Sequence, residues 1–394
     1  MRSLLPFILV CIGLLAPVGP APAFDRPIAP VTQGMLFPHI LDTDTYELNT
    51  RNIKVLKSQD KYLWMGTTVG LILYDTTTPE NYLVFDNRKG LLSNGIFAVK
   101  LDNKGRPWVG TYGGGLSYHD ESRWVNLNTP QGLCDAFVYD IEFAGDSIWI
   151  ATWSGANRLR GDPFSRSSWE RFTVENTHGG LIDDWVYAIE VGKDGRIWFG
   201  TESGISLFDG TAWRNWNHRN GLGAPYETVK DDNADGVSYF EGNHHERHSH
   251  ALPNIEDQTF RPNYVVSMLL DRANRLWIGT WGGGLALLDT QNFTFRNFTR
   301  KDGLPENFVL SLAEGPGGNL WIGTSGGLAR FDGETFTRFS KMNGLLGDFI
   351  FSLEFGPDHS LWVGGHYGMN RLILDPQTGN PMTAGLSGTG KSQP

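Results

Sequence analysis

The chain has 394 residues, with 33 Lys and Arg against 43 Asp and Glu, and its formal net charge of −10 argues against a nucleic-acid-binding groove. Only 19% of the residues are charged, while 40% are hydrophobic and 12% aromatic, which is the reverse of an intrinsically disordered composition. The 49 glycines, together with this aromatic content, favour a turn-rich all-β protein.

The first 23 residues have the pattern of a secretory signal peptide. A positive start precedes an apolar run over 4–15, and Ala21-Pro22-Ala23 forms an A-x-A cleavage site. The alternative is a membrane anchor, but the run is shorter than the roughly 20 residues that a membrane-spanning helix needs. We therefore expect a mature, exported chain without a transmembrane segment, which begins with a linker over 24–34.

Seven copies of one sequence motif follow, each with an apolar-Trp-apolar-Gly-Thr segment, a glycine-rich turn and a second short apolar segment. The marker tryptophans are Trp64, Trp108, Trp149, Trp198, Trp277, Trp321 and Trp362. They recur every 41 to 49 residues, apart from a gap of 79 between Trp198 and Trp277. Four short β-segments fit into each period, and a repeat of this length predicts an all-β fold, a seven-bladed β-propeller over 35–376.

The marker tryptophans are expected to be core residues rather than a ligand platform. Side-chain alternation places each Trp on the same face of its strand as the Gly two positions later, which suits packing between blades. The last copy lacks a convincing outer strand, and we expect the N-terminal segment 35–48 to complete the last blade and close the ring. The polar, glycine-rich tail over 377–394 is expected to be disordered.

The LWIGT-GGL phrase, an aromatic outer strand and a Gly-Leu step into the next blade resemble the two-component regulator propeller repeats. The step occurs at Gly90-Leu91, Gly132-Leu133, Gly180-Leu181, Gly221-Leu222, Gly303-Leu304 and Gly344-Leu345. The resemblance covers roughly residues 50–375, and two blades depart from it, with Ala151 for the repeat Gly and Gly365 for the repeat Thr. It implies a propeller like those in periplasmic sensor regions of hybrid histidine kinases, many of which recognise oligosaccharides. We find no kinase or response-regulator segment, so we expect the fold to carry over without the signalling role.

One side of the propeller is the predicted binding face, because the turn between the second and third strands and the connection into the next blade emerge there together. The residues that directly follow the repeat Thr in these turns are Tyr112, Trp153, Glu202, Trp281 and Ser325, with His366 and Tyr367 in the last blade. Exposed aromatic rings offer flat area to a sugar ring or an apolar ligand at little entropic cost. The alternative is that these rings pack against neighbouring loops.

The connections into the next blade carry Asn or Asp three residues after the Leu of the Gly-Leu step. These residues are Asn94, Asp184, Asn307 and Asp348, and Asn263 is the equivalent residue after a long insertion. A ring of such groups would suit ligand hydroxyls or a cation. The alternative is that each caps its own turn by accepting hydrogen bonds from backbone N–H groups.

An insertion over 223–262 accounts for the long gap between two tryptophans and is expected to lie over the same face. Asp231, Asn233 and Asp235 match the start of a calcium-binding loop, although the Glu expected at its twelfth position is absent. His244, His248 and His250 fall within a histidine-rich run that could bind Zn²⁺ or Cu²⁺. The alternative is a solvated polar loop without metal.

These features predict an exported, sensor-like binding module, periplasmic or secreted, that recognises a carbohydrate or a protein or peptide partner on the loop side. No cofactor is required by this prediction, and calcium is the ion that the insertion could add. The alternatives are an interaction scaffold and a propeller lyase or hydrolase. For an enzyme, Asp184, Glu202 and His366 are the candidate general acids or bases. The sequence does not define the oligomeric state.

Overall fold

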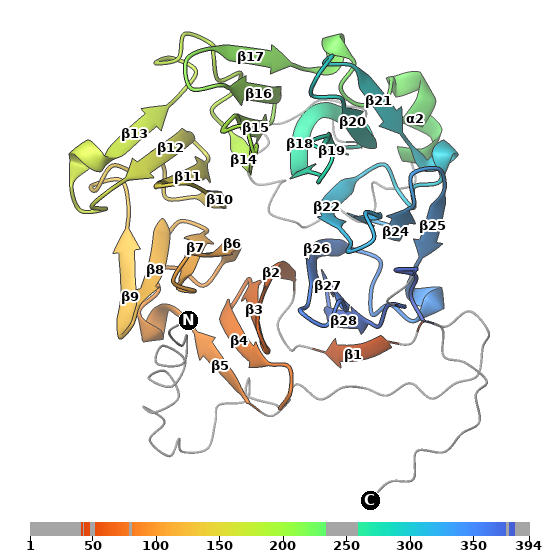
Figure 1. The fold of residues 1–394 in the computed structure, drawn as a ribbon, viewed down its shortest axis with the longest axis horizontal. Coiled ribbons are helices and arrows are strands. Elements are labelled where there is room, and N and C mark those ends of the chain that lie inside the picture. The colour runs from red at the N-terminus through yellow and green to blue at the C-terminus, as the bar shows by residue number, and fades with distance from the viewer. Residues whose placement is uncertain are drawn as a thin grey trace, which may run out of the picture.

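The computed structural model describes residues 41, 43–47, 52–78, 81–233, 259–375 and 378–382. In these ranges seven four-stranded antiparallel sheets are arranged around a central axis (Figure 1). The predicted fold class, a seven-bladed β-propeller, is therefore confirmed. We number the blades 1 to 7 in the chain order of their innermost strands.

The strands of a blade follow one another from the axis outwards. The innermost strands are β2 (Ile53–Gln59), β6 (Ile96–Leu101), β10 (Val138–Ala144), β14 (Val186–Val191), β18 (Arg261–Leu270), β22 (Val309–Glu314) and β26 (Ile350–Phe355). The second strands, which hold the marker tryptophans, are β3 (Tyr62–Thr67), β7 (Pro107–Thr111), β11 (Ser147–Thr152), β15 (Ile197–Thr201), β19 (Leu276–Trp281), β23 (Leu320–Thr324) and β27 (Leu361–Gly365). The third strands are β4 (Gly70–Asp75), β8 (Leu116–Asp120), β12 (Gly155–Arg160), β16 (Gly204–Phe208), β20 (Leu285–Leu288), β24 (Gly327–Phe331) and β28 (Gly368–Leu372). The outer strands are β5 (Tyr82–Phe85), β9 (Arg123–Leu127), β13 (Trp169–Phe172), β17 (Trp213–Trp216), β21 (Phe295–Phe298), β25 (Phe336–Phe339) and, for blade 7, β1 (Thr43–Glu47).

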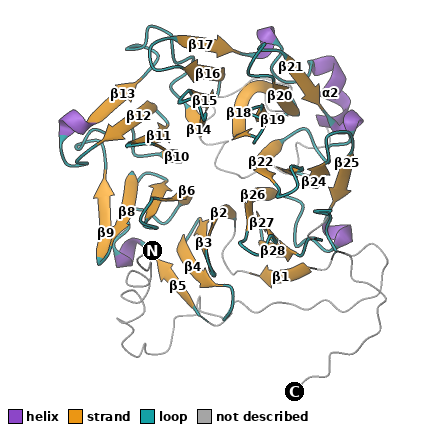
Figure 2. Cartoon of the chain, in the orientation of Figure 1, coloured by secondary structure: helices purple, strands orange, loops and turns teal. Residues whose placement is uncertain are grey.

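Short helices lie at the periphery of the ring (Figure 2). They are α2 (Tyr226–Asn233) and the 3₁₀ turns η1 (Asn87–Lys89), η2 (Arg166–Ser168), η3 (His218–Asn220), η6 (Arg300–Asp302) and η7 (Lys341–Asn343). Four of these turns end at the glycine of a Gly-Leu step, and Gly90, Gly221, Gly303 and Gly344 have φ between +104° and +123°. The left-handed backbone explains why the step begins with glycine.

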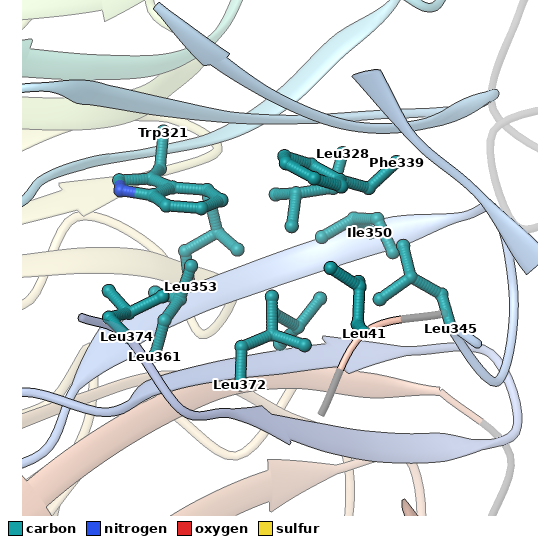
Figure 3. Close-up of a cluster of buried hydrophobic side chains, with 11 residues drawn as sticks. Leu41, Trp321, Leu328, Phe339, Leu345, Ile350, Leu353, Leu361, Leu372 and Leu374 are labelled. Atoms are coloured by element: carbon teal, nitrogen blue, oxygen red, sulfur yellow. The ribbon is translucent and has the colours of Figure 1, made fainter. Parts of the chain in front are cut away.

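The core is a chain of clusters between blades, built around the marker tryptophans, which are only 1% to 6% exposed. In one cluster Trp321 of β23 packs against Leu353 and Leu361 of the next blade (Figure 3). The glycine of the repeat makes this approach possible. A Cβ added to Gly323 would lie 2.2 Å from Ser311 Oγ and 2.7 Å from Cγ2 of Ile350 in the neighbouring blade. Large rings and missing side chains together let twisted sheets pack closely.

The N-terminal strand β1 is the fourth strand of blade 7. It pairs antiparallel with β28, from Thr43 opposite Leu372 to Glu47 opposite Gly368. Tyr46 anchors it, because this side chain is 4% exposed and its ring lies 5.5 Å from that of Trp362. Residues from both ends of the chain thus share one sheet, and the open edge that β28 would present is paired.

The C-terminal segment differs in part from its predicted disorder. Leu374 and Pro381 form an isolated β-bridge, and the Met382 N–H donates to the Ile373 carbonyl at 2.9 Å. These hydrogen bonds place residues 378–382 against the propeller, which polar composition alone did not indicate. The predicted signal peptide and linker lie outside the described residues. In the part of the chain that the structure describes, no helix is long and apolar enough to span a bilayer.

Candidate ligand-binding face

The turns after the second strands and the connections into the innermost strands lie on the same side of the ring, which we call the loop face. Backbone hydrogen bonds join the two kinds of segment in successive blades. Trp153 N–H donates to the Phe137 carbonyl, Glu202 N–H to that of Trp185 and Ser325 N–H to that of Phe308, each at 3.2 Å. We call the opposite side, which carries the remaining turns, the hairpin face.

The repeat Thr fixes the turn that presents the predicted binding residues. In six blades its buried hydroxyl donates to the carbonyl of the glycine that opens or directly precedes the third strand, at 2.7 to 2.9 Å. In blade 7 Gly365 takes its place, and a Cβ there would lie 2.5 Å from the Phe349 carbonyl oxygen. The residue after the Thr is therefore held at the same place in each blade, whatever its side chain.

Ten aromatic rings form a continuous series on the loop face, from blade 2 to blade 6. Neighbouring ring centroids lie 4.6 to 6.4 Å apart, which is the range of favourable ring contacts. We call this series the aromatic belt; its members are Phe97, Tyr112, Phe137, Tyr139, Trp153, Trp185, Tyr187, Tyr264, Trp281 and Phe308. The first seven are half-buried, whereas the last three are at most 8% exposed. The solvent-accessible part of the belt therefore lies over blades 2 to 4.

The predicted aromatic binding residues fall into two groups. Tyr112 and Trp153 belong to the half-buried part of the belt, and Trp281 belongs to its buried end, where it stacks on Tyr264 at 5.7 Å. His366 and Tyr367 lie apart in blade 7. His366 is half-buried with its ring 5.1 Å from that of Phe351, while Tyr367 is 62% exposed.

The Asn and Asp residues of the connections are engaged with the backbone of their own turns. Each accepts a hydrogen bond from a backbone N–H in the turn that follows the preceding outer strand. The pairs are Asn94 with Asn87 at 2.8 Å, Asp184 with Val174 at 2.7 Å, Asn263 with His218 at 2.6 Å, Asn307 with Arg300 at 2.9 Å and Asp348 with Lys341 at 2.8 Å. These side chains therefore cap their turns, which was the alternative to a role in ligand binding.

A charged group lies at the centre of the belt. Arg261 Nη1 is 3.3 Å from Glu202 Oε1, and the Tyr187 hydroxyl lies 3.5 Å from Glu202 Oε2. Burial raises the pKa of the Glu202 carboxyl, and the nearby Arg261 opposes the rise. Burial also raises the pKa of the Tyr187 hydroxyl. The belt thus combines apolar ring faces with a carboxylate, a guanidinium and hydroxyl groups.

A second set of charges lies on the innermost strands, deeper along the axis. Lys100 of β6 forms an ion pair with Glu142 of β10, and Asp140 accepts a hydrogen bond from Ile189 N–H at 2.9 Å. Burial raises the pKa of Asp140 to about 6 and that of Glu190 to about 8. At the depth of the belt, but on the other side of the ring, the Lys54 ammonium lies 3.9 Å from the centroid of Phe351, and burial lowers its pKa to about 8.

The candidate general acids or bases are not brought together. Asp184 and Glu202 flank β14 and β15 in blade 4, whereas His366 lies in blade 7, on the far side of the ring (Figure 1). Burial, and then the nearby Lys54, lower the pKa of His366. The structure therefore defines no acid–base pair among the three residues.

The described part of the insertion differs from a loop, because residues 226–233 form α2. Asp231 and Asn233 lie at its C-terminal end, and the buried Asn233 amide donates to the carbonyls of Thr259 at 2.9 Å and Gly282 at 2.8 Å. Its oxygen accepts from Asn307 Nδ2 at 2.9 Å. Asp235, His244, His248 and His250 lie outside the described residues. Among those that are described, no three acidic, Cys or His side chains gather as a metal site, and both metal sites stay predictions.

Sequence reasoning missed the axis-facing rings Phe97, Tyr139 and Tyr187. Each is the second residue of an innermost strand and follows a fully buried Ile or Val. Because side chains alternate, burial of the first residue between blades turns the second towards the axis. An apolar-aromatic pair at the start of these three innermost strands was the signal available in the sequence.

The family described as "Two component regulator propeller" matches residues 180–203, 259–282 and 303–326. Over 162 residues, 39% of this chain and 12% of the relative, the sequence is 27% identical to histidine kinase P4 of Formosa agariphila. The fold is similar to the extracellular domain assigned to a hybrid two component system of B. thetaiotaomicron, with a TM-score of 0.63 and 20% identity over 82% of this chain and 39% of that chain. It is also similar to virginiamycin B lyase from Staphylococcus aureus, with a TM-score of 0.57 and 11% identity over 82% of this chain and 97% of that chain. The chain thus spans well under two thirds of the length of this histidine kinase and of this two component system domain, and three of its segments match the two-component regulator propeller model.

Proposed function

We propose that this chain, a sensor-like propeller with two-component regulator propeller repeats, is an exported module that binds a carbohydrate on its loop face. The observation that carries the proposal is the half-buried part of the aromatic belt over blades 2 to 4. The signal-peptide pattern supports a periplasmic or secreted location.

The chemistry of the belt favours a sugar over a purely apolar ligand. Flat rings such as Tyr139 and Trp153 suit the C–H faces of pyranose rings, while sugar hydroxyls need donors and acceptors around them. The Tyr187 hydroxyl and the ion pair of Glu202 with Arg261 supply such groups beside the rings. Because the rings contact one another, their positions are set before binding, which reduces the entropic cost of ordering them.

The belt spans several blades, which favours an extended ligand over a single sugar. The rings of Phe97, Tyr139 and Tyr187 come from three consecutive innermost strands, with centroids 5.6 and 5.0 Å apart. Each blade would contact part of the ligand, so affinity should rise with oligosaccharide length until the belt is covered. A short peptide with aromatic side chains is the competing ligand class, and the test includes it.

The test uses the mature chain, residues 24–394, on an array of oligosaccharides that also displays aromatic peptides. The affinity of each array hit is then measured by isothermal titration calorimetry for the unchanged mature chain and for the variants Trp153→Ala and Tyr139→Ala. The matched control is Phe164→Ala, which removes a 61% exposed ring from the hairpin face. We expect a glycan hit whose affinity falls at least about tenfold in both belt variants, about 1.4 kcal/mol, and stays unchanged in the control. The proposal would be overturned if only peptides bound, or if both belt variants bound the glycan with unchanged affinity.

A further inference from the structure

A cavity lies on the hairpin face, between blades 3 and 4, and it has no part in the proposed sugar site. Its volume is about 400 Å³. The side chains that matter here are Trp149, Arg158, Arg160, Lys193 and Phe208, and backbone at Gly145, Gly192 and Gly210 completes the wall. We call it the blade 3–4 pocket.

The equivalent place between blades 5 and 6 is almost filled, with a volume of about 30 Å³. There the Asp271 carboxylate accepts hydrogen bonds from Trp277 Nε1 at 3.0 Å, from Arg275 Nε at 2.7 Å and from the Arg275 backbone N–H at 2.9 Å. Blade 2 repeats the arrangement, since Asp102 accepts from Trp108 Nε1 at 3.4 Å and from Arg106 Nε at 2.7 Å. In these blades an aspartate thus satisfies the indole N–H of the marker tryptophan.

Blade 3 lacks this aspartate. The strand register places Ala144, paired with Ser147, where blade 5 has Asp271, bonded to Arg275. The shorter side chains open the pocket beside Trp149. This tryptophan is 3% exposed, and within the described residues its Nε1 has no hydrogen-bond partner. Its Nε1 is not among the fully buried unpaired atoms, so it reaches the space of the pocket, where a ligand acceptor at the place of the missing carboxylate can take its N–H bond.

Two guanidinium groups approach the same place from β12. Arg158 lies with its guanidinium carbon 5.5 Å from the ring centroid of Trp149, and Arg160 Nε lies 3.2 Å from Ser147 Oγ. Their ion-pair partners, Glu170 and Asp146, are 48% and 72% exposed, so these pairs hold the arginines weakly. Each guanidinium has five N–H donors and can therefore serve a second carboxylate, in the two-pronged geometry that Arg and carboxylate favour.

We propose that the blade 3–4 pocket binds the carboxylate group of a small ligand, which takes the place of the aspartate that blade 3 lacks. The carboxylate would accept from Trp149 Nε1 and from the arginines of β12. The apolar faces of Trp149 and Phe208 and the glycine backbone leave room for a ring or side chain beyond it. A sugar acid and the C-terminal residue of a peptide present this same chemistry.

Calorimetric titration at fixed ionic strength tests the proposal on the mature chain. One arm compares sodium glucuronate with glucose, and the other compares acetyl-Gly-Phe carrying a free C-terminus with its amide. We expect one of the two carboxylates to bind at least about tenfold more tightly than its neutral counterpart. No preference for a carboxylate in either arm would overturn the proposal.

Ala144→Asp supplies the carboxylate from the protein itself and is the sharpest variant. We expect it to weaken binding of the carboxylate probe at least about tenfold and to raise the melting temperature, because it pairs the Trp149 N–H. Gln291→Glu, an added charge at an exposed turn of the hairpin face, is the control and should change neither. Arg158→Gln should weaken binding even if Ala144→Asp folds poorly. Binding that survives both pocket variants would contradict the assignment, while Trp153→Ala on the loop face should leave it unchanged.

Discussion

The marker tryptophans and the aromatic belt are both made of large rings, yet they differ in how they recur and in how they are buried. Trp198 of blade 4 and Trp321 of blade 6 occupy the same place in their repeats and are 1% exposed between blades. Tyr139 and Tyr187 occupy a place that holds Lys54 in blade 1 and Val266 in blade 5, and they remain half-buried at the axis. The tryptophan position, which is the same in every blade, stabilises the fold. The second position of the innermost strands varies from blade to blade and determines which groups the loop face presents.

This difference also separates the two candidate sites. The belt arises where innermost strands carry rings instead of aliphatic or charged residues. The blade 3–4 pocket arises where Ala144 replaces an aspartate that two other blades use to satisfy their tryptophan. In both cases the feature depends on a place that varies from blade to blade, since blades 4, 6 and 7 have Gly192, Gly315 and Gly356 where blade 5 has Asp271.

The largest effect is expected at the one blade whose core comes from both ends of the chain. Removing residues 24–48 deletes β1, leaves β28 as an open edge and exposes the surface that Tyr46 covers. We expect the truncated chain to be insoluble or to lose its near-ultraviolet circular dichroism. A soluble truncated chain with the spectrum of the full mature protein would show that the ring closes without β1.

The next effect compares a repeated ring with a belt ring. Trp321→Ala should lower the free energy of unfolding by about 3–5 kcal/mol, because it leaves a cavity between blades 6 and 7. Trp153→Ala should cost about 1–2 kcal/mol, since part of its ring already contacts solvent. Urea unfolding followed by fluorescence measures both. Equal losses of unfolding free energy in the two variants would show that core and belt rings do not differ in their contribution to stability.

A smaller effect is expected from the side chains that cap the connections. Asn307→Ala leaves the Arg300 N–H and the buried Asn233 oxygen without their partner, and we expect a loss of about 1–3 kcal/mol. Asn94→Ala breaks the same cap at an exposed turn, so about 0.5–1 kcal/mol should be lost. If the two variants were equally stable, the bond from Asn307 to α2 would contribute nothing.

The last effect concerns pH and the charges along the axis. Burial, with repulsion from Glu142, raises the pKa of Glu190 from 4.5 to about 8. The folded protein keeps a proton that the unfolded chain releases, so this stability is present below about pH 4.5 and is lost as the pH rises through about 8. Glu190→Gln stays neutral, and it should remove on the order of 1–2 kcal/mol of the decline between about pH 5 and pH 8. Urea unfolding at both pH values checks this. If the stability of the variant declined with pH as much as that of the unchanged protein, another group than Glu190 would be responsible.

The fold could be predicted because the Trp, Gly and Thr of the repeat each have a task that recurs in almost every blade. The loop face could be predicted for the same reason, since Tyr112 and Trp153 follow the repeat Thr. Trp281 follows it too, but it is 8% exposed, because a longer β18 pairs with it through Arg261. Local spacing carries no information on such tertiary pairing.

The insertion shows the same limit in a second way. Residues 231–235 match a calcium-loop pattern in sequence, yet Asp231 and Asn233 lie in α2, and Asn233 is held by groups from blades 5 and 6. Those partners are 26 to 74 residues away along the chain. A short motif cannot reveal hydrogen bonds that only the assembled ring provides.

The central claim is that the half-buried part of the aromatic belt is the surface that a ligand covers. Hydroxyl-radical footprinting with mass spectrometry tests it directly, on the mature chain with and without the oligosaccharide selected by the array. We predict that bound ligand protects Tyr139, Trp153 and Tyr187 from oxidation and leaves Phe164 on the hairpin face unchanged. Unchanged oxidation of all three belt residues at saturating ligand would contradict the claim and move the binding site elsewhere on the propeller.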